Sequence, residues 1–556
     1  MKNRRTRPGP TGRRAKRTIE WCSEWLASRF AIDRRALAAF RIGLGGLLLV
    51  DLALRSRWLG AFYTDDGVLP RRALFSDYAA AESFFTLSGE PWAIALFFGT
   101  MGVAALAMVV GYRTRVATIL SWLFLLALHA RNPMILNGGD NLFLMLFFWG
   151  MFLPLGDRWS IDALRSREAT STSATSVATM AVLLQVVLMY VTNAIHKSRS
   201  DLWMDGEAVA YVMQADQFTI FLGNHIAEWF VLLRAVTLAW LVLLAAAPLL
   251  LVCSGTPRAV LASLFAGMHV GMLATMRLGI FPLVVVVAVV PFYQTVVWDG
   301  VERLASRVGA IDQATNLYER HFRRLRPEPD ADEDRPGHRV TPDEDRPDPS
   351  ATVGVDGPRS SVATEGARQG RSVRDLIDAS VDRGSVVFST VIPWVFVVLV
   401  VLSNAQAVEY TEVPDPAEEV LDSTKMEQTW RMFAPNPVHT TNWFVAAGEL
   451  ENGTTVDVIH GGQVQRDRPD DIDARIRSAR WRKYFANVYQ ADNENHRSYL
   501  ANHLCGSWNR SHETNVDTVT VYRGYERTTP HGGSEASGEV TLVEYDCSGP
   551  FVQRGD

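Results

Sequence analysis

Residues 36–54 of the chain read ALAAFRIGLGGLLLVDLAL. A run of about 20 mostly apolar residues can cross a bilayer as a helix. Eight further apolar runs follow, at residues 91–112, 116–129, 142–155, 177–196, 227–252, 259–278, 280–298 and 386–404. The runs at 116–129 and 142–155 are short, so we expect them to be tilted, re-entrant or extended by their flanks. The sequence thus predicts an α-helical polytopic membrane protein, with about eight helices in residues 36–300 and one more at 386–404.

Charged residues collect between and beyond these runs. Residues 1–35 form a basic leader, whose first 20 residues hold eight Lys and Arg against one Glu. Residues 301–385 form a charged linker, and the part from residue 327 is expected to be largely disordered. This part contains the sequence DEDRP twice, at 332–336 and 343–347. It is interpreted as a cytoplasmic tether, with folding on a partner as the alternative. This composition excludes a basic nucleic-acid binder, and it points to membrane lipid as a partner while leaving any protein partner unidentified.

The placement of arginine predicts how the chain crosses the cell membrane. Cytoplasmic loops carry an excess of Lys and Arg, and the basic leader therefore places the N-terminus inside. Arg113, Arg158, Arg258 and the stretch 303–326 then also fall inside. The ninth run carries residues 405–556 out of the cell, so the sequence predicts a multi-pass protein with an extracytoplasmic C-terminal domain.

This C-terminal domain is acidic and has the pattern of a folded α+β unit. It holds 24 Asp and Glu against 14 Lys and Arg. Strand-like runs lie at 443–450, 454–459, 516–524 and 539–545, and an Arg-rich helix-like segment lies at 471–489. Cys505 and Cys547 lie in the compartment where a disulfide persists, and we expect them to pair. Metal binding by these cysteines with His503 or His512 is the alternative.

Ionisable residues within or beside membrane helices are candidates for function. Under the predicted topology most of them gather near the outer face: His129, Arg131, Asp140, His196, Lys197, Asn224, His225, His269 and Arg277. An outward-facing polar pocket follows if the helices pack together. Asp51 and Arg55 are four residues apart and could pair on one helix face.

Lys197 differs from the other cations of the membrane region. The chain has 50 Arg and only five Lys, and Lys197 is the only lysine between residues 16 and 425. Arginine serves equally well as a topological charge, but only lysine readily loses its proton when desolvated and acts as a base or nucleophile. An interfacial cation without a chemical role is the structural alternative. The sequence has no GxxxxGK[ST], HExxH, GxSxG or CxxC motif, so ATP hydrolysis, zinc proteolysis and esterase chemistry lack support.

Several short segments together resemble a known family. They are FRIGLG at 40–45, FYTDDG at 62–67, NGGD at 137–140, LPLGDRWSID at 153–162, His196-Lys197, WMDG at 203–206, His269 and GIFP at 279–282. Their order over about residues 30–300 resembles the HTTM (horizontally transferred transmembrane) domain, which is the membrane part of the vitamin K-dependent gamma-glutamyl carboxylase family. The segment WRMFAPNP at 430–437 is similar to one that follows the domain in prokaryotic relatives.

The resemblance implies a role for Lys197. In the carboxylase, a lysine ahead of a Trp-x-x-Gly segment is the base in the oxygenation of a reduced quinone. Lys197 precedes Trp203 and Gly206 and is the matching position, with a spacing one residue longer. The product is a strong base that deprotonates a glutamyl side chain, which then adds CO₂. The second catalytic histidine of the carboxylase has no counterpart here, because residues 137–146 contain no His.

Three functional hypotheses remain open from the sequence. The first is an HTTM protein whose outward-facing pocket binds a lipid or quinone. The second is an enzyme of the carboxylase type that uses a reduced quinone of the vitamin K or menaquinone class. Its hypothetical catalytic residues are Lys197, His196, Asp140 and His269, and its hypothetical cofactor contacts are Trp203, Asn141 and Phe281; no metal ligand is expected. The third is a non-enzymatic membrane anchor that carries a binding module.

Overall fold

The computed structural model describes residues 24–25, 27–78, 82–166, 171–307, 384 and 386–553. Most of the basic leader, both DEDRP repeats of the linker and Cys22 lie outside the described residues. The fold begins with a two-residue strand, β1 (Ile32–Asp33), which pairs with β2 (Ser173–Ala174).

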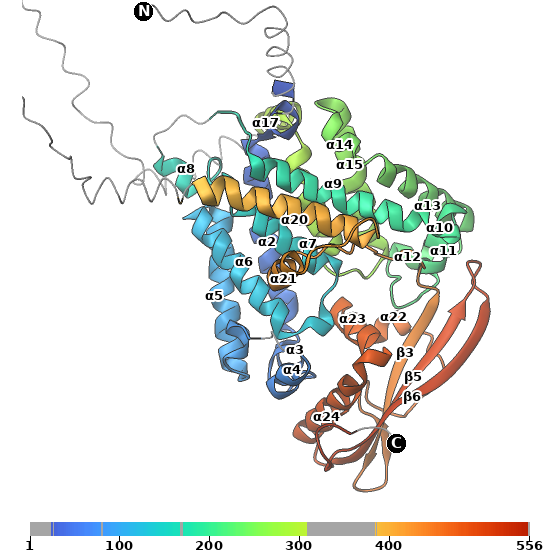
Figure 1. Cartoon of the computed structure of the whole chain (residues 1–556). Coiled ribbons are helices and arrows are strands. Elements are labelled where there is room, and N and C mark those ends of the chain that lie inside the picture. Colours follow the sequence, from blue (N-terminus) through green and yellow to red (C-terminus); the bar gives the residue numbers. More distant parts are fainter. Residues whose placement is uncertain are drawn as a thin grey trace, which may run out of the picture.

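Apolar helices form a bundle that occupies the upper part of Figure 1. The helices are α2 (Arg34–Ser56), α5 (Pro91–Val110), α6 (Thr114–Arg131), α7 (Gly138–Gly150), α9 (Val177–Ser198), α13 (Phe230–Ala245), α14 (Leu249–Val252), α15 (Thr256–Thr275), α16 (Phe281–Val289) and α20 (Ile392–Ala407). Although α20 follows the linker, it packs along α9, where Thr192 Oγ1 donates to Asn404 Oδ1 at 2.8 Å. The last predicted apolar run therefore belongs to the same bundle as the others.

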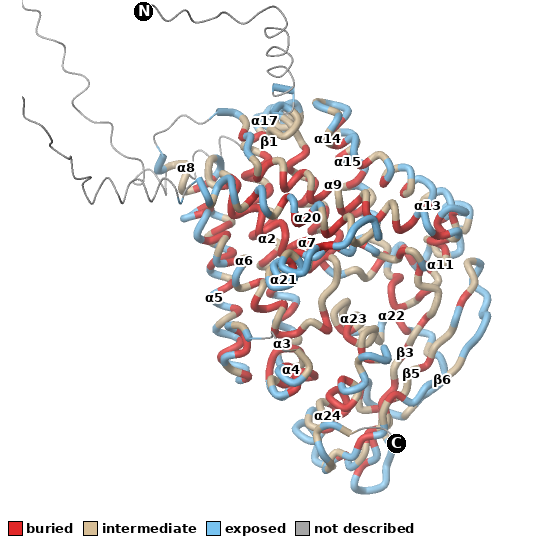
Figure 2. The backbone as a smooth tube through the Cα atoms, viewed as in Figure 1, coloured by how far each residue is buried: buried red, intermediate tan, exposed pale blue. Residues whose placement is uncertain are grey.

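Helix α7 lies in the interior of this bundle. Every residue from Leu142 to Gly150 is buried, and Figure 2 shows the buried residues concentrated along α2, α7 and α9. By contrast, α5 and α13 turn large apolar side chains outward, including Val103 (69% exposed), Val231 (82%) and Val242 (70%). Such an apolar exterior is unfavourable in water and suits contact with lipid.

Fewer helices than predicted have the length and composition of a membrane span. Five of the described helices qualify, namely α2, α5, α9, α15 and the helix Val387–Ala407 that combines η5 (Val387–Val391) with α20. A bent pair raises the number to six. Four of the nine predicted runs therefore do not give such a helix on their own. The run 116–129 lies in α6, which is 18 residues long and is not among the five. The run 142–155 yields the 13-residue α7, the run 227–252 is divided between α13 and α14, and the run 280–298 is bent.

Prolines coincide with the breaks in the two longer runs. Pro248 lies between α13 and α14, and Pro291 lies in the short η3 (Val290–Phe292) after α16. Proline has no N–H to donate and clashes with the preceding turn. The chain turns by 104° between Phe281–Phe292 and the amphipathic α17 (Thr295–Arg307), whose residues are all at least partly exposed. Helices α17 and α8 (Ile161–Arg165) lie at the end of the bundle opposite the C-terminal domain (Figure 1).

Short elements cap the other end of the bundle, which we call the docking end because the C-terminal domain packs there. They are α3 (Leu59–Tyr63), α4 (Arg71–Asp77), η1 (Phe84–Thr86), η2 (Pro133–Ile135), α10 (Asp201–Met204), α11 (Ala208–Met213) and α12 (Leu222–Ile226). Asn132 connects two of them by donating from Nδ2 to Phe62 O at 2.9 Å while its Oδ1 accepts from Met134 N.

The C-terminal domain consists of an antiparallel sheet and several helices, of which α22 and α23 lie between the sheet and the bundle (Figure 1). The strand order is β4-β3-β5-β6, with β3 (Thr440–Leu450), β4 (Thr455–Asp457), β5 (Val516–Thr528) and β6 (Ser534–Asp546). The helices are α21 (Asp415–Thr424), α22 (Ile472–Arg475), α23 (Ala479–Val488), η6 (Ala491–Asn493) and α24 (Glu494–Ser511). All four predicted strands are present, and the predicted helix 471–489 is broken before Ser478, whose side chain caps α23.

A disulfide links α24 to the end of β6. Cys505 and Cys547 are bonded, with their Cα atoms 5.8 Å apart and 42 residues apart in sequence. Helix α24, which the sequence patterns did not predict, packs on β5 and β6. The disulfide therefore closes a loop that contains the whole β5–β6 hairpin.

Candidate functional site

Lys197 ends α9 at the docking end of the bundle. Its ammonium donates to Met432 O at 2.9 Å and lies 3.4 Å from the centroid of the Trp203 ring. The residue is only 2% exposed. Two contacts therefore hold this side chain in place, namely a cation–π contact with the indole of Trp203 and a hydrogen bond to one neutral carbonyl.

The acceptor belongs to an unusual loop at residues 430–433, which we call the 430–433 loop. Three of its non-glycine residues, Trp430, Met432 and Phe433, have positive φ of 40°, 32° and 63°. Such backbone is costly and persists where the surroundings impose it. Here the carbonyls turn toward the bundle, and its side chains bind them.

Two further side chains of the bundle donate to this loop. Asn193 Nδ2 bonds Trp430 O at 2.8 Å and Arg431 O at 3.0 Å, and Trp203 Nε1 bonds Phe433 O at 2.9 Å. With Lys197, each carbonyl from 430 to 433 has a donor from α9 or α10. The motif that resembles prokaryotic relatives is therefore the segment that closes over Lys197.

A cavity of about 540 Å³ lies beneath the 430–433 loop. Its apolar wall comes from the bundle and includes Tyr190, Leu233, Trp240, Met268, Met272 and Phe281. Its polar part includes Asn137, Asn141, Asn193, Lys197, Arg482 and Lys483. We call it the membrane-side cavity. Large, mostly apolar pockets with a few convergent polar groups are typical ligand sites.

The cavity brings together five of the seven hypothetical site residues. Lys197, His269, Trp203, Asn141 and Phe281 line it. His269 is 1% exposed, its Nδ1 lies 2.8 Å from Phe265 O, and its ring lies edge-on to Trp240 and Phe281. Asp140 and His196 are not among the lining residues.

Asp140 instead belongs to a buried ion cluster at the docking end. Its Oδ1 accepts from Arg55 Nη2 at 2.7 Å and from Arg480 Nη2 at 2.9 Å. Asp51 bonds Arg55 Nε at 2.6 Å, as the spacing of four predicted, and Arg480 Nη2 at 2.7 Å. Two carboxylates and two guanidiniums balance in charge, so Asp140 is held as a structural partner.

Arg480 is the residue of this cluster that sequence patterns missed. It comes from α23 of the C-terminal domain and reaches partners more than 300 residues earlier in the chain. Burial opposes its charge, but the carboxylates of Asp140 and Asp51 outweigh burial and raise the pKa of Arg480 above its usual range. The one available signal was the arginine-rich character of residues 471–489.

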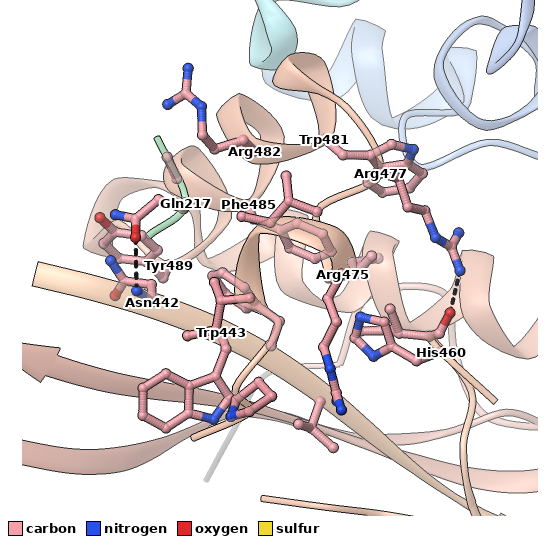
Figure 3. Close-up of a pocket in the computed structure, with 18 of the residues that line it drawn as sticks. Gln217, Asn442, Trp443, His460, Arg475, Arg477, Trp481, Arg482, Phe485 and Tyr489 are labelled. Carbon is pink, nitrogen blue, oxygen red and sulfur yellow. Dashed lines mark hydrogen bonds between the residues drawn. The ribbon is translucent and has the colours of Figure 1, made fainter. Parts of the chain in front are cut away.

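A second, smaller cavity of about 210 Å³ lies within the C-terminal domain, between the sheet and α23 (Figure 3). Phe444 and Phe485 stack in its wall with ring centroids 4.5 Å apart. Arg475 pairs with Asp471 and Arg477 donates to Ile459 O, whereas Arg482, which also lines this cavity, has no acidic partner among the described residues. Figure 3 draws Arg482 pointing away from the cluster formed by the other labelled side chains.

Helical packing, an apolar exterior and an amphipathic cavity define the class: a helical membrane-associated protein with a docked α+β domain. Residues 30–298 match the HTTM domain, and this part of the chain is an HTTM domain. No curated protein and no solved structure matches the chain. The resemblance predicted from the short segments is thereby confirmed for the HTTM domain.

Proposed function

We propose that this HTTM protein binds a membrane-borne amphiphile, a lipid or quinone, in the membrane-side cavity. The observation that carries the proposal is the division of the cavity wall, which is apolar along the bundle and polar beneath the 430–433 loop. An apolar chain can lie along Trp240, Met268 and Met272 while a polar head reaches Lys197. Burial of such a chain contributes about 0.8 kcal/mol per CH₂ group.

The proposal places the cavity on the outer side of the cell membrane. The docking end carries the C-terminal domain, which holds the Cys505–Cys547 disulfide. Disulfides persist in oxidising compartments outside the cytoplasm. At the opposite end, α8 and α17 carry arginines, in agreement with the positive-inside rule.

The test is mass spectrometry of lipids and quinones that co-purify with the full chain. Gly271 lines the cavity, and a Cβ there meets nothing within 4 Å, so Gly271→Phe adds a ring at the cavity wall without a backbone clash. Gly267 is one helical turn away with equal space, but it is not among the lining residues, so Gly267→Phe is the matched control. We expect the first variant to lose the ligand and the second to retain it. Empty extracts from the wild type refute the proposal.

A quinol-dependent reaction of the carboxylase type is the second candidate. It is favoured by the ammonium of Lys197, which is enclosed and has only Met432 O and an indole ring as described partners. Lys197→Arg preserves the charge, whereas Lys197→Ala removes it. Quinol oxidation or CO₂ incorporation must be lost in both variants if Lys197 is the base. Full activity of the arginine variant refutes this role.

A further inference from the structure

The polar part of the membrane-side cavity is basic. Four cations line it, namely Lys197, Arg431, Arg482 and Lys483. Glu427 is the single carboxylate among the described residues that line it, and it is exposed to solvent. Two of the four cations, Arg482 and Lys483, come from α23 of the C-terminal domain. The domain thus supplies charge to a cavity whose apolar wall belongs to the bundle.

Arg482 has no acidic partner within the described part of the chain. Its guanidinium lies 4.0 Å from the centroid of the Phe218 ring, and its Nε is buried without a hydrogen-bond partner. Burial, with a smaller contribution from Arg277, lowers the pKa of Arg482 to about 10. Arg480, two residues earlier on the same helix, has two carboxylate partners. Helix α23 therefore directs one arginine to paired acids and another to a cavity where no described acid pairs with it.

The neighbouring cations also have only neutral partners. Lys483 Nζ donates to the amide oxygen of Asn487 at 3.2 Å, and Lys197 Nζ donates to Met432 O. Burial and the nearby Arg482 lower the pKa of Lys483, and the carboxylate of Asp140, which does not bond it, offsets part of this shift. An enclosed charge without a counter-charge is costly, and a bound anion would offset that cost.

The N-terminal turn of α7 adds a favourable field for an anion. Asn137, Gly138 and Gly139 line the same cavity, and α7 is 13 residues long. The positive end of a helix dipole stabilises negative charge near its first turn. A Cβ at Gly138 would meet nothing closer than 3.9 Å, so the backbone there is open to a ligand.

We propose that the head group of the bound amphiphile is an anion of the phosphate type, held by Arg482 and Lys483 of the C-terminal domain, while its apolar chain lies along the bundle. This inference rests on the proposed function, because it concerns the same cavity, and it narrows the ligand from lipids and quinones to anionic lipids. A neutral quinone has no charge for these cations. The C-terminal domain is then part of the binding site.

The experiment compares lipid retention by the full chain reconstituted with phosphatidylcholine and phosphatidylglycerol together. Lipid that stays with the purified protein is quantified by mass spectrometry. We expect phosphatidylglycerol to be enriched on the wild type, and Arg482→Gln with Lys483→Gln to reduce that enrichment on the order of tenfold, the size of one charge-assisted contact. The control pair Lys425→Gln with Arg527→Gln removes the same charges from surface pairs with Asp422 and Glu535 and should retain the enrichment.

The outcomes separate this inference from the proposed function. If the wild type retains both lipids equally and Gly271→Phe loses both, the proposal of an anionic head group is overturned, but the proposal of a lipid site is supported. Failure to retain either lipid overturns the anionic head group, and if no quinone co-purifies either, it also overturns the proposed function. A third measurement is the unfolding temperature in inorganic phosphate. If phosphate raises it equally in the wild type and in Gly271→Phe, the cations bind a free anion, and the proposal of a lipid head group is overturned.

Discussion

Replacing Arg480 by leucine should release α23 from the bundle. The guanidinium bonds Asp51 Oδ1 at 2.7 Å and Asp140 Oδ1 at 2.9 Å, and it also lies 3.4 Å from Ile135 O. Without it, two carboxylates share Arg55 alone, and the cluster has a net charge of −1. Removal of one partner from a buried ion pair costs about 3–5 kcal/mol.

Hydrogen exchange of the α23 amides measures this cost directly. A loss of about 3–5 kcal/mol corresponds to exchange faster by about 10²- to 10⁴-fold when the amides exchange by local opening. The surface variant Arg475→Leu breaks an exposed pair with Asp471 and should cost less than about 1 kcal/mol. Mass-spectrometric exchange of the full chain in detergent resolves both variants.

We infer that the faster exchange in Arg480→Leu arises from unbalanced charge rather than from lost packing, and a double variant tests this inference. Asp51→Asn combined with Arg480→Leu leaves one carboxylate, Asp140, against Arg55, which already bond at 2.7 Å. Protection of α23 should then recover in part. Unchanged exchange in Arg480→Leu, or a double variant no better protected than the single one, would refute the reasoning.

Three further predictions concern the C-terminal domain. His496 is 3% exposed, and burial lowers its pKa because it disfavours the protonated ring. The folded state therefore favours neutral His496, and this contribution to stability is present above the unfolded-state pKa near 6.5 and is lost as the pH falls. Thermal unfolding followed from pH 8 to pH 5 should show this loss, and His496→Phe should reduce its slope. The Cys505–Cys547 disulfide spans 42 residues, and replacing both cysteines by serine should destabilise the domain by about 4 kcal/mol. Denaturant titration measures this loss, and an unchanged unfolding midpoint contradicts a constraint of that size. Single cysteines introduced at Asn452 and at Val355, with the other cysteines replaced, test the topology by labelling intact cells with an impermeant thiol reagent. The cysteine at Asn452 should react in intact cells and the one at Val355 only after lysis. Labelling of both from one side contradicts the proposed topology.

Local patterns located most of the helices, all four strands of the C-terminal sheet and the family, but they did not predict α24. The run at 36–54 is a helix from Arg34 to Ser56, and the strand-like runs at 443–450 and 516–524 lie within β3 and β5. Hydrophobic periodicity and turn residues are local properties, and the sequence carries them without reference to distant partners. The count of spans was less accurate, because an apolar run does not reveal whether its helix is enclosed by protein, as α7 is, or broken at proline.

The candidate site was only partly predictable for the same reason. Lys197 and His269 were found from their position and residue type, and Trp203 was found from the family resemblance. All three line the cavity. The 430–433 loop was recognised as a motif, but its contact with Lys197 joins residues 235 positions apart. Asp140 was assigned to the pocket because it is acidic and near the membrane boundary, whereas Arg55 and Arg480 hold it elsewhere.

The sequence by itself determined that this chain forms apolar helices, an HTTM domain and a mixed C-terminal unit with two cysteines. The tertiary structure decided which charges meet. Arg480 and Arg482 are the same residue type on one helix, but two positions correspond to a rotation of about 200°, so they face nearly opposite directions. One enters an acidic cluster, and the other borders the cavity. Residue type sets what a side chain can bind, and only packing between distant segments sets what it reaches.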